Sequence, residues 1–501
     1  MSLLGIDVGT TGCKIIVFNI EGKILAQAYG EYPLLHSQPG WSELDSHVVW
    51  DKISDCIQSV AQQTKNDPVE AISVASQGEA VTPISKSGEI LANTITSFDA
   101  RTTDISNEIS QKASKLELMK ITGIPLSDIT TLAKLTWIQR YQPEVFKQTW
   151  KFLGYEDFVF YKLGLPPVVD YSLAARTMLF DIIQKDWSEQ MLNMINVDSS
   201  MFSSTAASGT IIGEIGSDIA KDLGLPQNVV GVTGGHDQPC GALGAGIIDE
   251  GDVMDATGTV ECIVPVFSKP VLNQLMIDGN FSCYPHVVEV MYVTLGFVFS
   301  GGVNLRWFRD NFAQYEIEQA ASSGQDVYDL LMKSMPKDPS PIMLLPHFNG
   351  SGTPKMDLES KGAILGLTLG TSKPDMVKSI LEGISFEIKH NLMLLDSAGV
   401  TINEIRAIGG GAKSEQWLQL KADIFGKKVI ALDVSEGVCL GTAILAGTAI
   451  GKYPSVRSAV DQLVRIKQVY HPREEIQKKY EERMKVYTQI YPAIQSIYHQ
   501  L

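Results

Sequence analysis

The sequence predicts an α/β protein of two domains, and three observations carry this prediction. A pattern of apolar strand, aspartate, Gly/Thr-rich turn and returning strand occurs at 5–18 and again at 254–264. The chain has 501 residues, which is too many for a single hydrophobic core. Strand-like and helix-like segments alternate along it. No linker rich in Pro, Ser or charge separates the halves, so we place a hinge near Ala245, between domains 1–245 and 246–501.

The two copies of the hairpin pattern are candidate anion sites. Asp7 is followed by a turn containing Thr10 and Thr11, and the second turn contains Gly258 and Thr259. Glycines let backbone N–H groups approach an anion, and threonine hydroxyls add donors. Either hairpin alone is better explained by ordinary turn preferences. Two copies, each opening one half of the chain, favour a polyphosphate bound from both sides.

The remaining elements follow from local patterns. Short apolar runs predict strands at 23–29, 70–75, 229–233 and 404–408. Apolar residues every three or four positions predict helices at 46–63, over most of 100–200 and at 474–490. Ser46 is placed to cap the first of these helices, and Trp137, Trp150 and Trp187 are expected in the core. Polar residues follow several strands, where a ligand crevice is expected.

Composition excludes several classes of protein. The net charge is −16 with no Lys/Arg block, which disfavours a nucleic-acid binder. The six cysteines are scattered without a Cys-x-x-Cys pair, which indicates reduced thiols in a cytoplasmic protein and no zinc cage. No apolar run reaches the length of a membrane span, and the N-terminus lacks the basic region of a signal peptide. A Gly-x₄-Gly-Lys-Ser/Thr phosphate loop is also absent from the sequence.

Several longer motifs occur in a recognisable order. They are the opening hairpin, the segment 39–45, Asp99-Ala100-Arg101, Gly235-His236-Asp237-Gln238, Gly258-Thr259, Gly409-Gly410-Gly411-Ala412 and the segment 362–382. By these motifs the chain resembles the FGGY carbohydrate kinases over essentially its whole length. The resemblance implies two duplicated actin-like (ribonuclease H-like) ATPase domains with a cleft between them. It also implies ATP and Mg²⁺ as cofactors, and transfer of the γ-phosphate to a hydroxyl of a small sugar or polyol.

The reaction itself requires an oriented hydroxyl, neutralised phosphates and in-line geometry. Asp237 follows a strand and two glycines, where a carboxylate can face a cleft and accept the hydroxyl proton. Position alone is equally consistent with Asp237 capping a helix that begins near Pro239. The resemblance favours Asp237 as the catalytic base. His236 is expected to be a structural neighbour.

The resemblance also implies the binding residues. For ATP they are Thr10, Thr11, Lys14, Gly258, Thr259, Gly302, Gly410, Gly411 and Ala412, and Asp7 is expected to hold Mg²⁺ through water. For the sugar they are Gln77, Glu79, Asp99, Arg101, Asp237 and Gln238. Some of them have a plainer alternative: Lys14 as a solvated residue, Asp7 as a turn residue, and Asp99 with Arg101 as an ion pair that shapes the loop, which is compatible with sugar contact as well. The glycine run is equally consistent with a turn before a helix capped by Ser414.

Departures from the family pattern leave the substrate open. Ile129 does not fit the N-terminal signature, which 131–137 does fit, and Ser97 stands where a Trp is usual. Gly78 stands where glycerol kinases carry Arg, which would make room for a longer substrate. A ketopentose such as xylulose is our first expectation, with polyols, hexuloses, gluconate or a non-catalytic ATP-binding regulator as alternatives. Trp41 and Phe98 are equally well explained as packing residues or sugar platforms. Homodimers are common in this family, although no feature of this sequence requires one.

Overall fold

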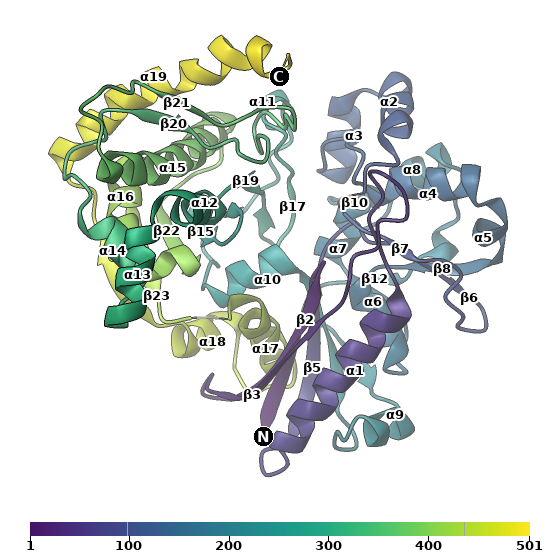
Figure 1. The fold of residues 1–501 in the computed structure, drawn as a ribbon. Helices are drawn as coiled ribbons and strands as arrows, with labels where there is room; N and C mark the ends of the chain where they lie inside the picture. The colour runs from purple at the N-terminus through teal and green to yellow at the C-terminus, as the bar shows by residue number, and fades with distance from the viewer. Residues whose placement is uncertain (98, 435, 501) are drawn as a thin grey trace.

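The computed structural model describes residues 1–97, 99–434 and 436–500. Phe98 therefore lies outside the described residues. Two sheets form the centres of the two halves, as Figure 1 shows. The first sheet has the order β13 (Ile211–Glu214), β14 (Val230–His236), β5 (Val69–Ser76), β1 (Ser2–Val8), β2 (Gly12–Asn19) and β3 (Ile24–Glu31). The second has the order β17 (Tyr284–Pro285), β18 (Tyr292–Val293), β16 (Glu261–Phe267), β15 (Asp252–Thr257), β22 (Glu404–Gly409), β23 (Lys428–Leu432) and β24 (Ile466–Tyr470), and β19 (Gly296–Val298) pairs with β16.

The two sheets repeat one topology. In the first, β1 pairs antiparallel with β2 and parallel with β5, and β5 pairs parallel with β14. In the second, β15 pairs antiparallel with β16 and parallel with β22, and β22 pairs parallel with β23. The predicted repeat of a hairpin is therefore confirmed, and it extends to whole sheets.

The other elements surround these sheets. The helices are α1 (Ser46–Gln63), α2 (Thr103–Lys112), α3 (Lys115–Thr122), α4 (Thr131–Tyr141), α5 (Pro143–Gln148), α6 (Tyr155–Lys162), α7 (Tyr171–Arg176), α8 (Glu189–Met194), α9 (Ser217–Asp222), α10 (Asp237–Gly244), α11 (Gln274–Asp278), α12 (Gly302–Phe312), α13 (Gln314–Ser323), α14 (Val327–Lys333), α15 (Lys373–Ala398), α16 (Glu415–Phe425), α17 (Gly437–Ala449), α18 (Val456–Leu463) and α19 (Glu474–Tyr498). The short strands are β4 (Glu43–Leu44), β6 (Thr82–Ser85), β7 (Thr94–Ile95), β8 (Thr149–Leu153), β9 (Val168–Asp170), β10 (Phe180–Asp181), β11 (Asp186–Trp187), β12 (Ser204–Ala206), β20 (Met343–Leu345) and β21 (Ala363–Leu365).

Several local predictions are corrected by the structure. Helix α1 has the predicted bounds, but its N-cap is Asp45, whose carboxylate accepts from the backbone N–H of His47, and not Ser46. The region 100–200 contains short strands among its helices, because antiparallel pairing of β6 with β8 overrides the helical pattern. Trp137 is buried, whereas Trp150 and Trp187 are half-buried at the edge of the core. All six cysteines are free, as predicted.

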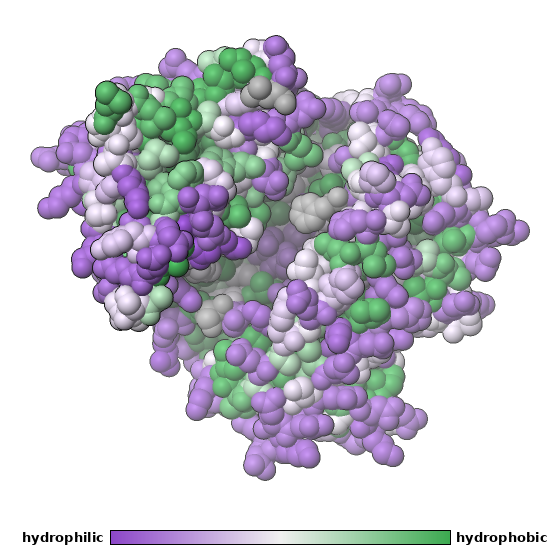
Figure 2. Space-filling view, in the orientation of Figure 1, coloured by the Kyte–Doolittle hydropathy of each residue, from purple (hydrophilic) through white to green (hydrophobic). Residues whose placement is uncertain are grey.

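Residues that follow parallel strands meet at one edge of the first sheet. Six of the seven residues of β1 are buried, as expected for a central strand, and Asp7 near its end is half-buried. Val8 and His236 both pair in register with Ser76 of β5. The ends of β1, β5 and β14 therefore lie side by side. A cleft between the two halves is visible in Figure 2.

Helices α10 and α17 join the halves through close packing. Helix α17 belongs to the second half, yet it packs on α10 and on strands β1, β5 and β14 of the first sheet (Figure 1). A methyl group at Gly244 would overlap the backbone carbonyl of Gly437, and one at Gly441 would overlap the carbonyl of Cys240. Small residues on both helices thus permit their close packing. No helix in the described part of the chain is long and apolar enough to cross a membrane.

We expect Gly244→Ala to lower the free energy of unfolding by about 1–3 kcal/mol, because the new methyl group meets backbone that cannot rotate away. Urea denaturation followed by circular dichroism measures this loss. Gly370→Ala is the matched control, since Gly370 is exposed and the nearest atom to an added methyl group is Thr368 Oγ1 at 3.7 Å. Equal stability of the two variants would show that α10 and α17 are not tightly packed.

Candidate functional site

An irregularity at the end of β14 sets the position of Asp237. The register of β14 against β5 shifts between Thr233 and Gly235, which is a β-bulge. A side chain at Gly234 would overlap the carbonyl of Val74, and Gly235 has a φ of +153°, where an added Cβ would meet Ser172 Oγ at 2.7 Å and Asp170 Oδ2 at 3.0 Å. The two glycines are therefore needed for the bulge, which turns the next residues toward the cleft.

Buried carboxylates hold the bulge in place. Glu156 accepts from the backbone N–H of Gly234 at 2.8 Å and from that of Asp170 at 2.8 Å. Ser172 Oγ accepts from the N–H of His236 at 2.8 Å and donates to Asp170 at 2.9 Å. Burial raises the pKa of Glu156 well above its usual range, and the neighbouring Asp170 raises it further. The backbone on which Asp237 stands is thus held by fixed hydrogen bonds.

Asp237 is the first residue of α10, and its N-cap is His236. The alternative that Asp237 caps this helix is therefore wrong. Burial raises the pKa of Asp237 to about 7, and the charges of Asp7 and Glu79 contribute, against hydrogen bonds from Gln238 that lower it. Its carboxylate is 25% exposed, so a substrate can reach it. A carboxyl group that titrates near neutrality suits a general base.

His236 contacts Asp237 without carrying a charge of its own. Its Nε2 lies 3.3 Å from Asp237 Oδ1, and its Nδ1 lies 3.0 Å from Tyr284 Oη. Burial lowers the pKa of His236 well below its usual range, and the cation of Arg176 lowers it further. The neutral ring therefore supports the orientation of Asp237, as expected for a structural neighbour.

Asp7 stands near the end of β1, beside Asp237. Burial raises the pKa of Asp7 to about 6, with Lys14 opposing this shift. Carboxylate oxygens are hard ligands that suit Mg²⁺, which binds through few protein groups and keeps several waters. Among the described residues there is no group of three or more His, Cys, Asp or Glu side chains that could cage a metal. The carboxylate of Asp7 is a donor of the kind that fits Mg²⁺.

The counterpart of Asp7 in the second sheet is neutralised within the protein. Asp255 on β15 pairs with Lys421 of α16 at 2.6 Å, and the same ammonium lies 3.0 Å from Glu261. Lys421 Nζ also donates to Thr257 Oγ1 at 2.6 Å. All three charged side chains are buried. The duplicated hairpins are therefore unlike in charge, and Asp7 is the one whose carboxylate borders the cleft.

The first hairpin turn is tied to the end of β5. The backbone N–H of Gly9 donates to the carbonyl of Gly12 at 3.0 Å, which closes the turn. Gln77 donates from Nε2 to the carbonyl of Gly9 and accepts from Thr10 Oγ1, both at 3.2 Å. Thr11 is exposed. Gln77, predicted to bind sugar, thus connects the first hairpin turn to the end of β5.

Lys14 forms an ion pair across the two halves. Its ammonium lies 2.7 Å from the carboxylate of Glu436, which immediately precedes α17. Both side chains are partly exposed. The sequence led us to expect Lys14 either near the phosphates or in solvent. Neither prediction anticipated an ion pair with Glu436, which lies near the other end of the chain.

The second hairpin is joined to the start of α12. The backbone N–H groups of Gly301 and Gly302 donate to the carbonyls of Thr259 and Gly258, both at 2.9 Å. A side chain at Gly302 would approach the carbonyl of Gly258 to 2.8 Å. Gly302 is therefore needed for the close approach of helix and turn.

The predicted adenosine loop lies against the same hairpin. Residues 410–413 form a single 3₁₀ turn, and Ser414 caps α16 by accepting from the backbone N–H of Trp417. A methyl group at Gly411 would come within 2.6 Å of the Thr257 side chain, whereas Gly410 is exposed. The sequence left open an adenosine-binding loop or a turn before a capped helix. The structure is compatible with both, because the turn leads into a capped helix and leaves bare backbone beside Ala412.

Asp99 and Arg101 form a buried ion pair. The guanidinium of Arg101 contacts both carboxylate oxygens of Asp99, at 2.8 and 2.7 Å, and Glu43 at 2.8 Å. It stacks on Trp41 and lies near Trp137, with centroid distances of 3.7 and 4.8 Å. Arg101 is 2% exposed, so this pair shapes the loop, as the plainer alternative held, and Trp41 packs on it.

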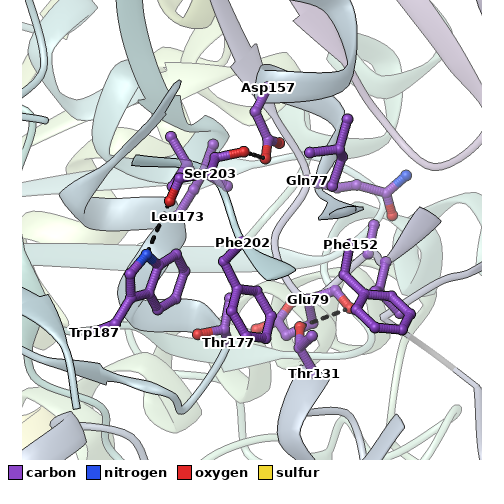
Figure 3. A pocket seen from close by; sticks show the side chains of 15 residues that line it. Gln77, Glu79, Thr131, Phe152, Asp157, Leu173, Thr177, Trp187, Phe202 and Ser203 are labelled. Atoms are coloured by element: carbon purple, nitrogen blue, oxygen red, sulfur yellow. Dashed lines mark hydrogen bonds between the residues drawn. The ribbon is translucent and has the colours of Figure 1, made fainter. Parts of the chain in front are cut away.

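Glu79 is held in a left-handed backbone conformation, with a φ of +57°. Its carbonyl accepts from Lys134 Nζ at 2.7 Å and from Thr131 Oγ1 at 3.3 Å, the latter shown in Figure 3. Its carboxylate contacts Arg176 and accepts from Ser97 Oγ at 3.1 Å. Lys134 and Arg176 were not predicted as site residues from the sequence, although Lys134 lies within the segment 131–137 that fits the family signature.

A small cavity lies behind these residues. Gln77, Glu79, Asp157 and Trp187 are among the side chains that surround it in Figure 3. Its volume of about 30 Å³ is enough for a water molecule and too small for a sugar. A sugar bound by Glu79 must therefore lie on the cleft side.

Comparison with known proteins agrees with this geometry. The model of the N-terminal domain of the FGGY family of carbohydrate kinases matches residues 2–244, and that of the C-terminal domain matches residues 256–450. The chain belongs to the FGGY family of carbohydrate kinases. It is therefore a sugar phosphotransferase, and the kinases of this family use ATP. The predicted family, enzyme class and fold are confirmed.

Individual relatives span the whole chain. A xylulose kinase of Bacillus subtilis is 28% identical over 494 residues, covering 98% of this chain and 96% of the relative. A gluconokinase of the same species is 28% identical over 503 residues, covering 100% and 97%. The crystal structure of a ligand-bound xylulose kinase from Lactobacillus acidophilus superposes with a TM-score of 0.90 at 24% identity, covering 100% of this chain and 99% of that chain.

Proposed function

We propose that this kinase transfers the γ-phosphate of ATP to a hydroxyl of a neutral ketose, a ketopentose such as xylulose. The position of Asp237 carries the proposal: it stands on a glycine bulge at the edge of the first sheet, near Asp7 and Glu79. Relatives named xylulose kinase support this choice, and the gluconokinase relatives make gluconate the alternative.

The chain's own residues account for the proposed reaction. Asp237 Oδ accepts the proton of the sugar hydroxyl as its oxygen attacks the γ-phosphorus, and Gln238 orients this carboxylate. Glu79 accepts hydrogen bonds from other hydroxyls of the sugar. The turns containing Thr10 and Gly258 donate to the β- and γ-phosphates from opposite sides, and Gly410 and Gly411 admit the adenosine. Mg²⁺ held by Asp7 would neutralise phosphate charge.

The charge of the site favours a neutral sugar over a sugar acid. Asp7, Glu79 and Asp237 lie close enough together for the first two to raise the pKa of the third. The nearby cation of Arg176 is paired with Glu79, and that of Arg101 with Asp99. Lys134 donates to the carbonyl of Glu79, is fully buried, and has a pKa that burial lowers to about 7, so the carboxylate of gluconate would add a further negative charge without an accessible cation among these residues.

The test is ATP consumption with Mg²⁺ across pentuloses, hexuloses, polyols and gluconate. We expect the highest kcat/KM for a ketopentose and a value at least tenfold lower for gluconate, since a difference of about 1.4 kcal/mol gives this ratio. Gluconate as the preferred substrate would overturn the charge argument. Binding of ATP without turnover of any compound would overturn the proposal as a whole.

The proposal also covers the domain boundary, the location of the enzyme in the cell and its oligomeric state. We place the domain boundary near Ala245, between α10 and β15, and the enzyme in the cytoplasm, as its free cysteines favour. A homodimer stays a prediction, which light scattering coupled to size-exclusion chromatography tests.

A further inference from the structure

Arg176 occupies the space that Gly78 leaves open. A methyl group at Gly78 would lie 3.1 Å from Arg176 Cγ, 3.3 Å from Arg176 Cβ and 3.3 Å from His236 Cδ2. The absent side chain therefore does not make room for a longer substrate, as the sequence had led us to expect. It makes room for the stem of an arginine from α7.

The guanidinium of Arg176 contacts a residue of the proposed sugar site. It pairs with Glu79 Oε1 and lies 5.3 Å from the ring centroid of Tyr284. The charge of Asp237 also helps to raise its pKa. Its Nε is buried and has no hydrogen-bond partner among the described atoms. Arg176 thus contacts Glu79 and lies near enough to the proposed base for their charges to interact.

Glu79 needs such a partner because its conformation is costly. A non-glycine residue in the left-handed region costs on the order of 1–3 kcal/mol and persists only when its surroundings hold it. Lys134 and Thr131 hold the carbonyl of Glu79, but they do not restrain the side chain. Ser97 donates one hydrogen bond to Oε2. Arg176 supplies the charge-assisted contact to the other carboxylate oxygen, which fixes the direction of the carboxylate.

We propose that Arg176 is a positioning residue for sugar recognition and acts through Glu79. This inference rests on the proposed function, in which Glu79 binds hydroxyls of the sugar. Arg176 lies against the buried Oε1, whereas Oε2 accepts one hydrogen bond from Ser97 and can accept a second from the sugar. Because Glu79 binds the sugar alike in the ground state and the transition state, Arg176 affects the KM for sugar and has little effect on kcat.

A double-mutant cycle separates this role from a structural one. Arg176→Met removes the charge and keeps most of the stem, and we expect the KM for sugar to rise roughly 10- to 100-fold, as for loss of a hydrogen bond to a charged group. The KM for ATP should stay unchanged. In a Glu79→Gln background, Arg176→Met should change the KM for sugar by less than about threefold, because the group through which it acts is already altered.

The outcomes distinguish the two proposals. If Glu79→Gln leaves the KM for sugar unchanged, the proposed role of Glu79 fails. If Glu79→Gln raises that KM and Arg176→Met raises it equally in both backgrounds, the inference about Arg176 is wrong and the proposed function stands. A parallel rise in the KM for ATP would also contradict it.

Two further variants test the proposal even if Arg176→Met does not fold. Arg176→Lys keeps a cation near Glu79, and we expect a KM for sugar between those of the wild type and Arg176→Met. Gly78→Ala shifts the stem of Arg176 without removing its charge, and we expect a several-fold rise that Glu79→Gln abolishes. If Arg176→Met does not fold, a wild-type KM in both of these variants would overturn the proposal.

Discussion

Replacing Asp237 by Asn is expected to lower kcat by roughly 10²- to 10⁴-fold, the usual contribution of a general base. Asn has nearly the same size and can keep hydrogen bonds with Gln238 and His236, so the bulge that carries it should be undisturbed. The loss should therefore appear in kcat, with the dissociation constants for sugar and nucleotide changing little. Steady-state kinetics and isothermal titration calorimetry measure the two effects separately.

The pH dependence of the wild type provides the control. Asp237 must be deprotonated to accept a proton, and burial raises its pKa to about 7. The kcat/KM for sugar should therefore fall as the pH drops below about 7 and level off above it. The residual activity of Asp237→Asn should lack this acidic limb. Full activity in the variant, or an unchanged limb, would show that another group is the base.

Lys421→Met is expected to lower the free energy of unfolding by about 3–5 kcal/mol, because it leaves a buried carboxylate without its counter-ion. Lys421 is buried and lies within 3.0 Å of both Asp255 and Glu261. The KM for ATP should rise as well, since the lost ammonium also bonds Thr257 at the base of the second phosphate turn. Urea denaturation and nucleotide titration test the two consequences.

Two companion variants sharpen this experiment. Lys467→Met removes an exposed lysine from β24 of the same sheet, and its stability should stay within about 0.5 kcal/mol of the wild type. Adding Asp255→Asn to Lys421→Met should recover much of the loss, because burial raises the pKa of the remaining carboxyl group, Glu261, to about 8, so that it is mostly neutral at pH 7 and no buried charge lacks its partner. If the double variant is no more stable than Lys421→Met, the loss comes from packing and not from charge.

Much of the fold could be predicted from local patterns. The 3.6-residue periodicity of 46–63 predicted α1 with its bounds, and the two Asp-Gly/Thr hairpins predicted the duplicated sheets. The position of Asp237 after a strand and two glycines indicated a base at a sheet edge. These signals are readable because turn chemistry and periodicity act between residues that are near in sequence.

The pairing of charges could not be predicted in the same way. Asp7 and Asp255 occupy equivalent hairpin positions, but Lys421 neutralises Asp255 while Asp7 borders the cleft. Lys14 was ambiguous in the sequence, and its partner Glu436 comes from the other half of the chain. Arg101 was expected at the sugar and is buried in an ion pair.

The sequence by itself determined the family, the reaction class and the two Asp-Gly/Thr hairpins, because each depends on a short motif with its own backbone chemistry. Only the tertiary structure decided which carboxylates are paired and which border the cleft. It also decided that Arg176, from a helix distant in sequence, occupies the space beside Gly78 and contacts Glu79. Such contacts arise when separate elements pack together, and side-chain volume and burial settle them.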